Sequence, residues 1–240
     1  MQQRSGASRL SNAGSNRSSR PVGIRAALHV KAADRIRRMI VKGTLPAGLD
    51  VAETELCAKP GMSRTPLREA MKLLAAEGLV ELRRNRSARI TPLDVKHVSD
   101  IFEAVACLER SAAELAAVRM TERDLARLAR LQTTLERHFT NGDLVSYFGV
   151  NQKVHASIIA ASSNAVLVNM HAHLMTQVER ARYFALRAHG RWEESIAEHR
   201  AILESLENRD PPRAGALLFE HVRHTGDAVC RLIADGEASD

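Results

Sequence analysis

The chain has 240 residues, which is long enough for two small domains that each bury a hydrophobic core. Its three cysteines are far apart and odd in number, so they match neither a disulfide framework nor a zinc knuckle, and a reduced cytoplasm is the simplest setting. The basic excess lies at one end: residues 1–92 hold 18 Lys and Arg against 7 Asp and Glu, whereas residues 93–240 hold 17 against 21. This imbalance indicates a nucleic-acid-binding domain followed by a domain with a different task.

Residues 1–25 are rich in Ser, Gly, Asn and Arg and contain no acidic residue, a composition that predicts a disordered basic tail. A transit peptide has a similar composition. No apolar run in the chain reaches the roughly 18 residues that indicate a membrane span. From residue 26 to 42, apolar residues recur at helical spacing and Gly43 ends the pattern, which predicts the first helix.

A helix-turn-helix is predicted next, with a short helix over residues 52–59 and a recognition helix between Ser63 and Gly78. Ser63 is a candidate N-cap whose hydroxyl would accept a backbone N–H of the first turn, and Gly78 is a candidate C-terminal cap. One face of the second helix is apolar and consists of Leu67, Met71 and Leu74. The other face is polar and consists of Arg64, Thr65, Arg68 and Lys72. Such a helix suits the DNA major groove, where arginine bonds the edge of guanine.

Two strands are predicted after the recognition helix, over residues 79–82 and 88–91, with residues 83–87 forming the tip of a β-wing between them. Arg84 and Arg86 in this tip are expected to contact DNA phosphates. The DNA-binding domain is therefore predicted over residues 26–92.

From residue 94 onward the sequence shows no strand pattern. Helices are predicted over residues 94–118, 121–140, 143–161, 164–188, 191–208 and 211–235. The predicted fold is thus mainly α: an N-terminal winged helix-turn-helix with a small β-wing, then an all-α bundle of six to seven helices. Residues 93–98 are expected to link the domains and begin the bundle, and residues 99–236 to form the ligand-sensing and dimerisation domain.

Three histidines lie on the inward faces of three different predicted helices: His155, His199 and His221. A single inward histidine is usually a hydrogen-bonded core residue. Three of them, with Asn151 one turn before His155, indicate a metal site built between bundle helices. Three imidazoles and one oxygen ligand suit Zn²⁺ or Ni²⁺. Four other histidines are interpreted as surface or incidental residues, and these are His171, His173, His189 and His224.

Two stretches resemble the winged-helix signature of the GntR family of bacterial transcription regulators. They are Ser63-Arg-Thr-Pro-Leu-Arg-Glu-Ala70 and Leu73-Leu-Ala-Ala-Glu-Gly-Leu-Val-Glu81. The predicted bundle resembles the FCD-type ligand-sensing domain of the FadR-like branch of that family. This resemblance implies a ligand-responsive repressor, with no enzymatic activity, that binds an inverted-repeat DNA operator as a homodimer.

The resemblance also implies ligands for the bundle domain. Metal-binding members carry an Asp or Asn four residues before a first His, and two further His on the last two helices. The matching residues in this chain are Asn151, His155, His199 and His221. Family members often hold a small carboxylate effector with an arginine where Val105 stands here. Arg182 is the candidate that replaces it.

Two alternatives remain open on the sequence. Three histidines around an open metal position also suit a metal-dependent hydrolase fused to a DNA-binding domain, although no general base stands at a recognisable spacing. The other alternative is a structural DNA-binding protein whose bundle binds no ligand.

Overall fold

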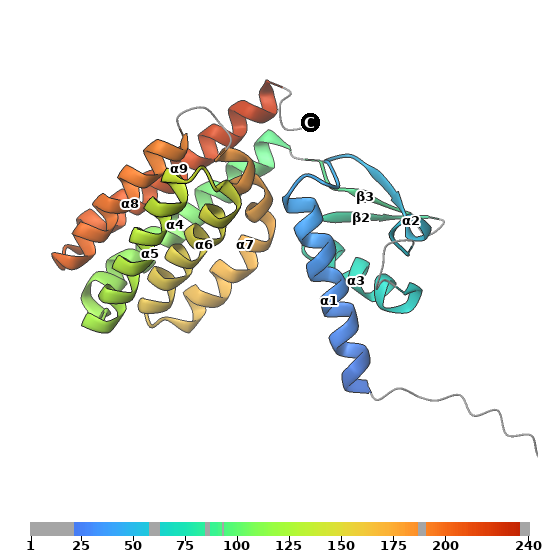
Figure 1. Cartoon of the computed structure of the whole chain (residues 1–240), viewed down its shortest axis with the longest axis horizontal. Coiled ribbons are helices and arrows are strands. Elements are labelled where there is room, and N and C mark those ends of the chain that lie inside the picture. Colours follow the sequence, from blue (N-terminus) through green and yellow to red (C-terminus); the bar gives the residue numbers. More distant parts are fainter. Residues whose placement is uncertain (1–21, 58–62, 85–86, 93, 187–190, 236–240) are drawn as a thin grey trace, which may run out of the picture.

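The computed structural model describes residues 22–57, 63–84, 87–92, 94–186 and 191–235. They form two lobes, one with a small sheet flanked by helices and the other an all-helical bundle (Figure 1). This confirms the predicted fold class, a mainly α chain with a winged helix-turn-helix before an all-α domain.

The first lobe is a winged helix-turn-helix with a core of its own. Its elements are α1 (Val22–Val41), β1 (Asp50–Ala52), α2 (Glu53–Cys57), α3 (Arg64–Ala76), β2 (Val80–Arg83) and β3 (Ser87–Ile90). Ile36 and Ile40 of α1 pack with Leu67 and Leu74 of α3 in one buried cluster. The strands are antiparallel in the order β1-β3-β2. The sequence did not predict β1, because three residues are too few to show an alternating pattern.

The two ends of the recognition helix α3 differ from each other in how well they were predicted. Gly78 follows the last turn with φ of +74°, and Leu79 N–H bonds back to Leu74 at 2.9 Å, as expected for a glycine-capped end. At the other end, Ser63 is the N-cap residue but its hydroxyl makes no capping bond, so that prediction was wrong. A capping hydroxyl bonds the second or third helical N–H, and Pro66 occupies the third position without one.

Among the described residues, the second lobe consists of six helices and no strand. These are α4 (Val95–Arg119), α5 (Glu122–Thr140), α6 (Leu144–Ala161), α7 (Ala165–Ala185), α8 (Arg191–Glu207) and α9 (Pro211–Ala234). Five starts are fixed by side chains that accept a backbone N–H of the first turn: Asp94, Thr121, Asp143, Asn164 and Asp210. The end of the fourth predicted helix, at residues 187–188, lies outside the described residues. In the described part of the chain, no helix is both long and apolar enough to cross a bilayer.

Helix α4 packs very closely against α9, and glycines make this possible. A Cβ atom added at Gly226 would lie 2.8 Å from Cβ of Phe102, and one at Gly215 would lie 2.5 Å from Cγ of Glu114. The large apolar core of the bundle lies between α4 and the helices α5, α6, α8 and α9. The inward faces of α6, α8 and α9 therefore meet in a buried region beside α4.

Candidate functional site

The recognition helix presents a polar face to solvent, as its sequence pattern predicts. Ser63, Arg64 and Thr65 are exposed at its start. Arg68 is also exposed, and its Nε donates to Glu53 of α2 at 3.0 Å. This contact orients the Arg68 guanidinium without burying it.

The wing lies beside this face. Arg84 is exposed at the end of β2, and Arg83 pairs with Asp50 of β1 at 3.1 Å. The predicted phosphate contact Arg86 lies outside the described residues. Of the arginines predicted to contact DNA, those that the structure describes, Arg64, Arg68 and Arg84, are therefore all exposed.

The structure brings the three predicted metal-ligating histidines together. His155 of α6, His199 of α8 and His221 of α9 are all buried, and one ring nitrogen from each lies within 4.8 Å of the others. Nε2 of His199 is 3.2 Å from Nε2 of His221. Asn151 is buried one helical turn before His155, and its side-chain oxygen has no hydrogen-bond partner among the described residues. A buried carbonyl oxygen without a protein partner is expected to bond a water molecule, a ligand or an ion.

Two carboxylates orient the histidine rings. Nδ1 of His155 lies 2.6 Å from Glu109 Oε2, and Nδ1 of His221 lies 2.7 Å from Glu198 Oε2. When an imidazole donates Nδ1–H to a carboxylate, its Nε2 keeps a free lone pair, which is the usual arrangement of a metal-binding histidine. Nδ1 of His199 has no partner among the described residues.

Burial keeps these imidazoles neutral. Burial, together with the nearby Arg182 cation, lowers the pKa of His155 to about 3. Burial also holds the pKa of His199 well below its ordinary value and lowers the pKa of His221. Burial opposes the ionisation of Glu109, but His155 and Arg182 hold the pKa of its carboxyl well below the usual range. A metal ion requires neutral imidazoles, so the cluster is in its binding form at neutral pH.

Arg182, the candidate effector contact, lies at the edge of this cluster. It is buried, with one terminal nitrogen 3.2 Å from both ring nitrogens of His155 and the other 3.5 Å from Glu109 Oε1. The cavity beside His155 and His199 measures about 10 Å³, roughly the space of one water molecule. A ligand larger than water therefore requires Arg182 or a neighbouring side chain to move.

His171 was wrongly interpreted from the sequence, whereas His224 lies partly at the surface as predicted but is not without a partner. His171 is buried, and its Nε2 lies 2.9 Å from Glu109 Oε1. His224 is half-exposed, but its Nδ1 lies 2.7 Å from Glu198 Oε1. His171 and Arg182 are eleven residues apart, which is three helical turns, so they share one face of α7. This shared face is the sequence signal that could have predicted His171 to point inward. His173 is exposed as predicted, and His189 lies outside the described residues.

A second ion network, which sequence reasoning missed, supports His221. Arg191 is buried at the start of α8 and contacts Glu198 at 2.8 Å, while another of its nitrogens donates to the His221 carbonyl and the Thr225 hydroxyl. Glu198 precedes His199 in the sequence, and adjacent helix positions point in different directions. Only the packing of α8 against α9 shows that Glu198 serves His221 instead.

Comparisons with known proteins agree with this architecture. Residues 28–90 match the family model of bacterial regulatory proteins of the gntR family, and residues 100–224 match the FCD domain. The chain is 28% identical to the uncharacterized HTH-type transcriptional regulator YdhC of Bacillus subtilis, over 85% of this chain and 92% of that protein. It is 32% identical to a probable D-xylose utilization operon transcriptional repressor of Paenarthrobacter nicotinovorans, over 79% and 83%.

A solved structure shows the same fold. The E. coli protein McbR/YncC superimposes with a TM-score of 0.75 at 21% identity, over 86% of this chain and 98% of that one. The matched families and relatives are transcription regulators and not enzymes, which removes the hydrolase alternative. The chain is a transcription regulator that belongs to the GntR family, in the FadR-like branch with an FCD domain.

Proposed function

We propose that this regulator is a homodimeric repressor that binds an inverted-repeat operator and responds to a small organic acid held at a metal ion. The observation that carries the proposal is the meeting of three buried histidines, an unpartnered amide oxygen and a buried arginine at one point of the bundle.

The residues present fit a divalent ion. Nε2 of His155 and His221 and one nitrogen of His199 would hold it, with the Asn151 oxygen as a fourth ligand. Three imidazoles and a neutral oxygen favour zinc or nickel over magnesium or calcium, which prefer sites built only from oxygen. The bound ion would supply positive charge and open coordination positions for a carboxylate. Arg182 would bond the same carboxylate, since a guanidinium is the usual partner of that group.

The DNA-binding part of the proposal rests on the exposed face of α3. Ser63, Arg64, Thr65 and Arg68 would lie in the major groove, and Arg84 and Arg86 would contact phosphates at the wing. Repression is supported by the relative from Paenarthrobacter nicotinovorans, which is described as a repressor. A homodimer would place its two recognition helices about one turn of DNA apart on an inverted repeat.

Metal analysis of the purified full-length protein, followed by a thermal-shift screen of organic acids, tests the sensor. We expect one zinc or nickel ion per chain and a higher melting temperature with some acids, because a ligand of the folded state stabilises it. A protein that neither contains nor takes up these metals would contradict the metal site.

Operator selection from a random DNA pool, followed by a reporter assay, tests the regulator. We expect an inverted repeat to be enriched and reporter expression to fall when the protein is present. Higher expression would identify an activator instead, and enrichment of a single half-site would contradict the dimer.

A further inference from the structure

A salt bridge fixes the end of the recognition helix to α1. Nε of Arg37 donates to Glu77 Oε2 at 2.9 Å, and a terminal nitrogen donates to Oε1 at 2.6 Å. Glu77 is the residue that ends α3. Asp34 accepts from the remaining nitrogen of Arg37. A bidentate pair fixes both distance and angle, so Arg37 sets where α3 ends relative to α1.

Helix α7 places another carboxylate, that of Glu179, on the same side of α1 as Arg37. Glu179 and Arg37 line one cavity of about 310 Å³ between α1, α6 and α7. Burial raises the pKa of Glu179, while the attraction of Arg37 lowers it and the repulsion of Glu77 raises it further. Glu179 thus lies within electrostatic reach of Arg37, although no hydrogen bond or ion pair joins the two side chains among the described residues. A movement of Glu179 toward Arg37 weakens the hold of Arg37 on Glu77.

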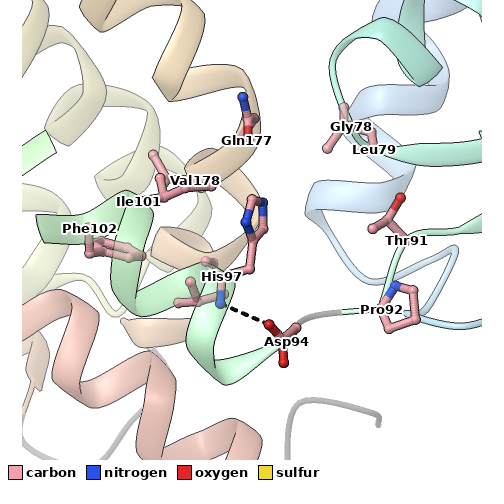
Figure 2. A pocket seen from close by; sticks show the side chains of 12 residues that line it. Gly78, Leu79, Thr91, Pro92, Asp94, His97, Ile101, Phe102, Gln177 and Val178 are labelled. Carbon is pink, nitrogen blue, oxygen red and sulfur yellow. Dashed lines mark hydrogen bonds between the residues drawn. The ribbon is translucent and has the colours of Figure 1, made fainter. Parts of the chain in front are cut away.

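The backbone at the end of α3 also lies against α7. Gln177 and Val178 face Gly78 and Leu79 across a crevice of about 50 Å³ at the junction of the two lobes (Figure 2). Gly78 and Leu79 directly follow Glu77 in the sequence. The end of the recognition helix is thus linked to α7 in two ways: through Arg37, which holds Glu77 and shares a cavity with Glu179, and through this crevice.

The same turn of α7 reaches the histidine cluster. Arg182 comes three residues after Glu179 and lies 3.2 Å from the ring nitrogens of His155. A divalent ion placed on His155 would repel this buried guanidinium, because little water screens the two charges and the one adjacent carboxylate, Glu109, is already shared by His155, His171 and Arg182. Occupation of the cluster must therefore shift Arg182 or be accompanied by an anion.

We propose that residues 177–182 of α7 couple the histidine cluster to the recognition helix, and that Glu179 is the positioning residue that competes with Glu77 for Arg37. The inference rests on the proposed function, because it takes the histidine cluster as the ligand site. A ligand that moves Arg182 moves this turn of α7, changes the attraction between Glu179 and Arg37, and so changes the angle of α3 at the operator.

Hydrogen–deuterium exchange of the full-length protein, with zinc chloride as the probe, tests the coupling. In the parent protein, zinc is expected to change the exchange of the amides of residues 73–79 by about fivefold or more, the usual lower size of such coupling. Glu179→Gln is expected to remove this response and leave the zinc affinity, measured by competition with a chelator, unchanged. Glu207→Gln changes an exposed glutamate of α8 and serves as the matched control.

Two results would overturn the coupling while leaving the metal site intact. One is zinc binding to the parent protein without any response at residues 73–79. The other is a full response in Glu179→Gln. A response lost equally in Glu207→Gln would also count against the assignment, because that side chain is remote from Arg37.

A metal-free experiment separates this inference from the metal site itself. Arg182→Met removes the buried cation and is expected to change exchange at residues 73–79 without any ion. In the Glu179→Gln background the same substitution should have no further effect at these residues, because the coupled residue is already gone. Additive effects would overturn the coupling. If zinc fails to bind the parent protein, the metal proposal fails, and this metal-free experiment alone then tests the coupling between α7 and the recognition helix. Arg182→Gln, which also removes the charge but keeps a hydrogen-bonding head group, replaces Arg182→Met if that variant does not fold.

Discussion

Three imidazoles that share one ion cannot lose it independently. We expect His155→Ala and His221→Ala each to remove most of the bound metal, and the double variant to be no worse than either single one, because the first substitution already empties the site. Metal content and melting temperature, measured for the parent and all three variants, give the complete double-mutant cycle. Unrelated core histidines would instead show additive losses of stability, with no metal in the parent protein.

In the metal-free protein, buried His155 makes stability fall in acid. Its pKa is about 3 in the folded chain against an ordinary value of 6.5, so below 6.5 the unfolded chain binds a proton that the folded chain does not. Stability is therefore complete above pH 6.5 and declines as the pH drops toward 3, by about 1.4 kcal/mol per pH unit for this group. Urea unfolding between pH 7 and 5, in the presence of a chelator, measures the decline. His155→Leu should make it shallower, and an unchanged slope would contradict this prediction.

The sequence could predict the histidines but not the residues that hold them. His155, His199 and His221 each continue an apolar stripe, so helical periodicity alone turns them inward. Glu198 and Arg191 lie in a charged stretch of α8, where periodicity cannot tell a solvated side chain from one buried against the next helix. Their partners depend on how α8 packs on α9, which the spacing of residues along one helix does not contain.

Among the elements, α3 and the wing should contribute to DNA binding in different ways. Arg68→Ala is expected to cost about 1–3 kcal/mol of operator binding and to relax the preference at one base pair. Arg84→Ala and Arg86→Ala are expected to weaken binding to all sequences and to lower the salt dependence by about one unit each. Fluorescence anisotropy at several salt concentrations separates the two effects. Equal operator affinity for Arg68→Ala and the parent would refute the assignment of the recognition helix.

The contact between α4 and α9 leaves no room for a side chain at Gly226. Gly226→Ala would place a methyl group 2.8 Å from Cβ of Phe102, so the helices must separate, at a cost of about 1–3 kcal/mol. Gly149→Ala in α6 is the matched control, because nothing lies within 4 Å of its added Cβ. That variant should gain up to about 1 kcal/mol from better helix propensity. Chemical denaturation compares the two, and equal effects would contradict the steric argument.

The predictions for individual helices and strands failed where one local preference opposed another or where the element was too short to show a pattern. Ser63 has the right residue type for a capping side chain, but Pro66 removes one of the two N–H groups that it could bond. The strand β1 contains a single buried residue, Val51, and it forms because β3 lies beside it. The long helices were predictable because their apolar periodicity runs over many turns and because capping residues stand at their starts.

For the whole molecule, the division of charge along the chain predicted two domains, but it could not predict how they touch. The cavity that Arg37 shares with Glu179, and the crevice that Leu79 shares with Gln177, join residues far apart in sequence. No periodic pattern links them. The bounds of the predicted domains likewise stay predictions, since the two lobes are in contact and residue 93 lies outside the described residues.

Large apolar side chains exposed on the bundle suggest where the proposed homodimer forms. Val166 and Met170 lie four residues apart on one face of α7 and are 66% and 53% exposed, and Val118 of α4 is 70% exposed. Exposed apolar side chains that cluster on one surface often mark a protein interface. We therefore expect the bundle, rather than the winged helix, to hold two copies together.

Light scattering tests this arrangement. A fragment of residues 93–240 should be a dimer, whereas residues 26–92 should be monomeric and bind a half-site poorly.

In the full-length protein, Val166→Glu combined with Met170→Glu should favour the monomer, because two carboxylates per copy would have to be buried unpaired. Ala172→Glu, at an exposed position elsewhere on α7, is the control and should remain dimeric. The monomeric variant should also lose its advantage for an inverted repeat over a single half-site, because only a dimer presents two recognition helices at a fixed distance. A monomeric 93–240 fragment would exclude the bundle as the dimer interface, and dimerisation that survives both substitutions would move the interface away from this face of α7.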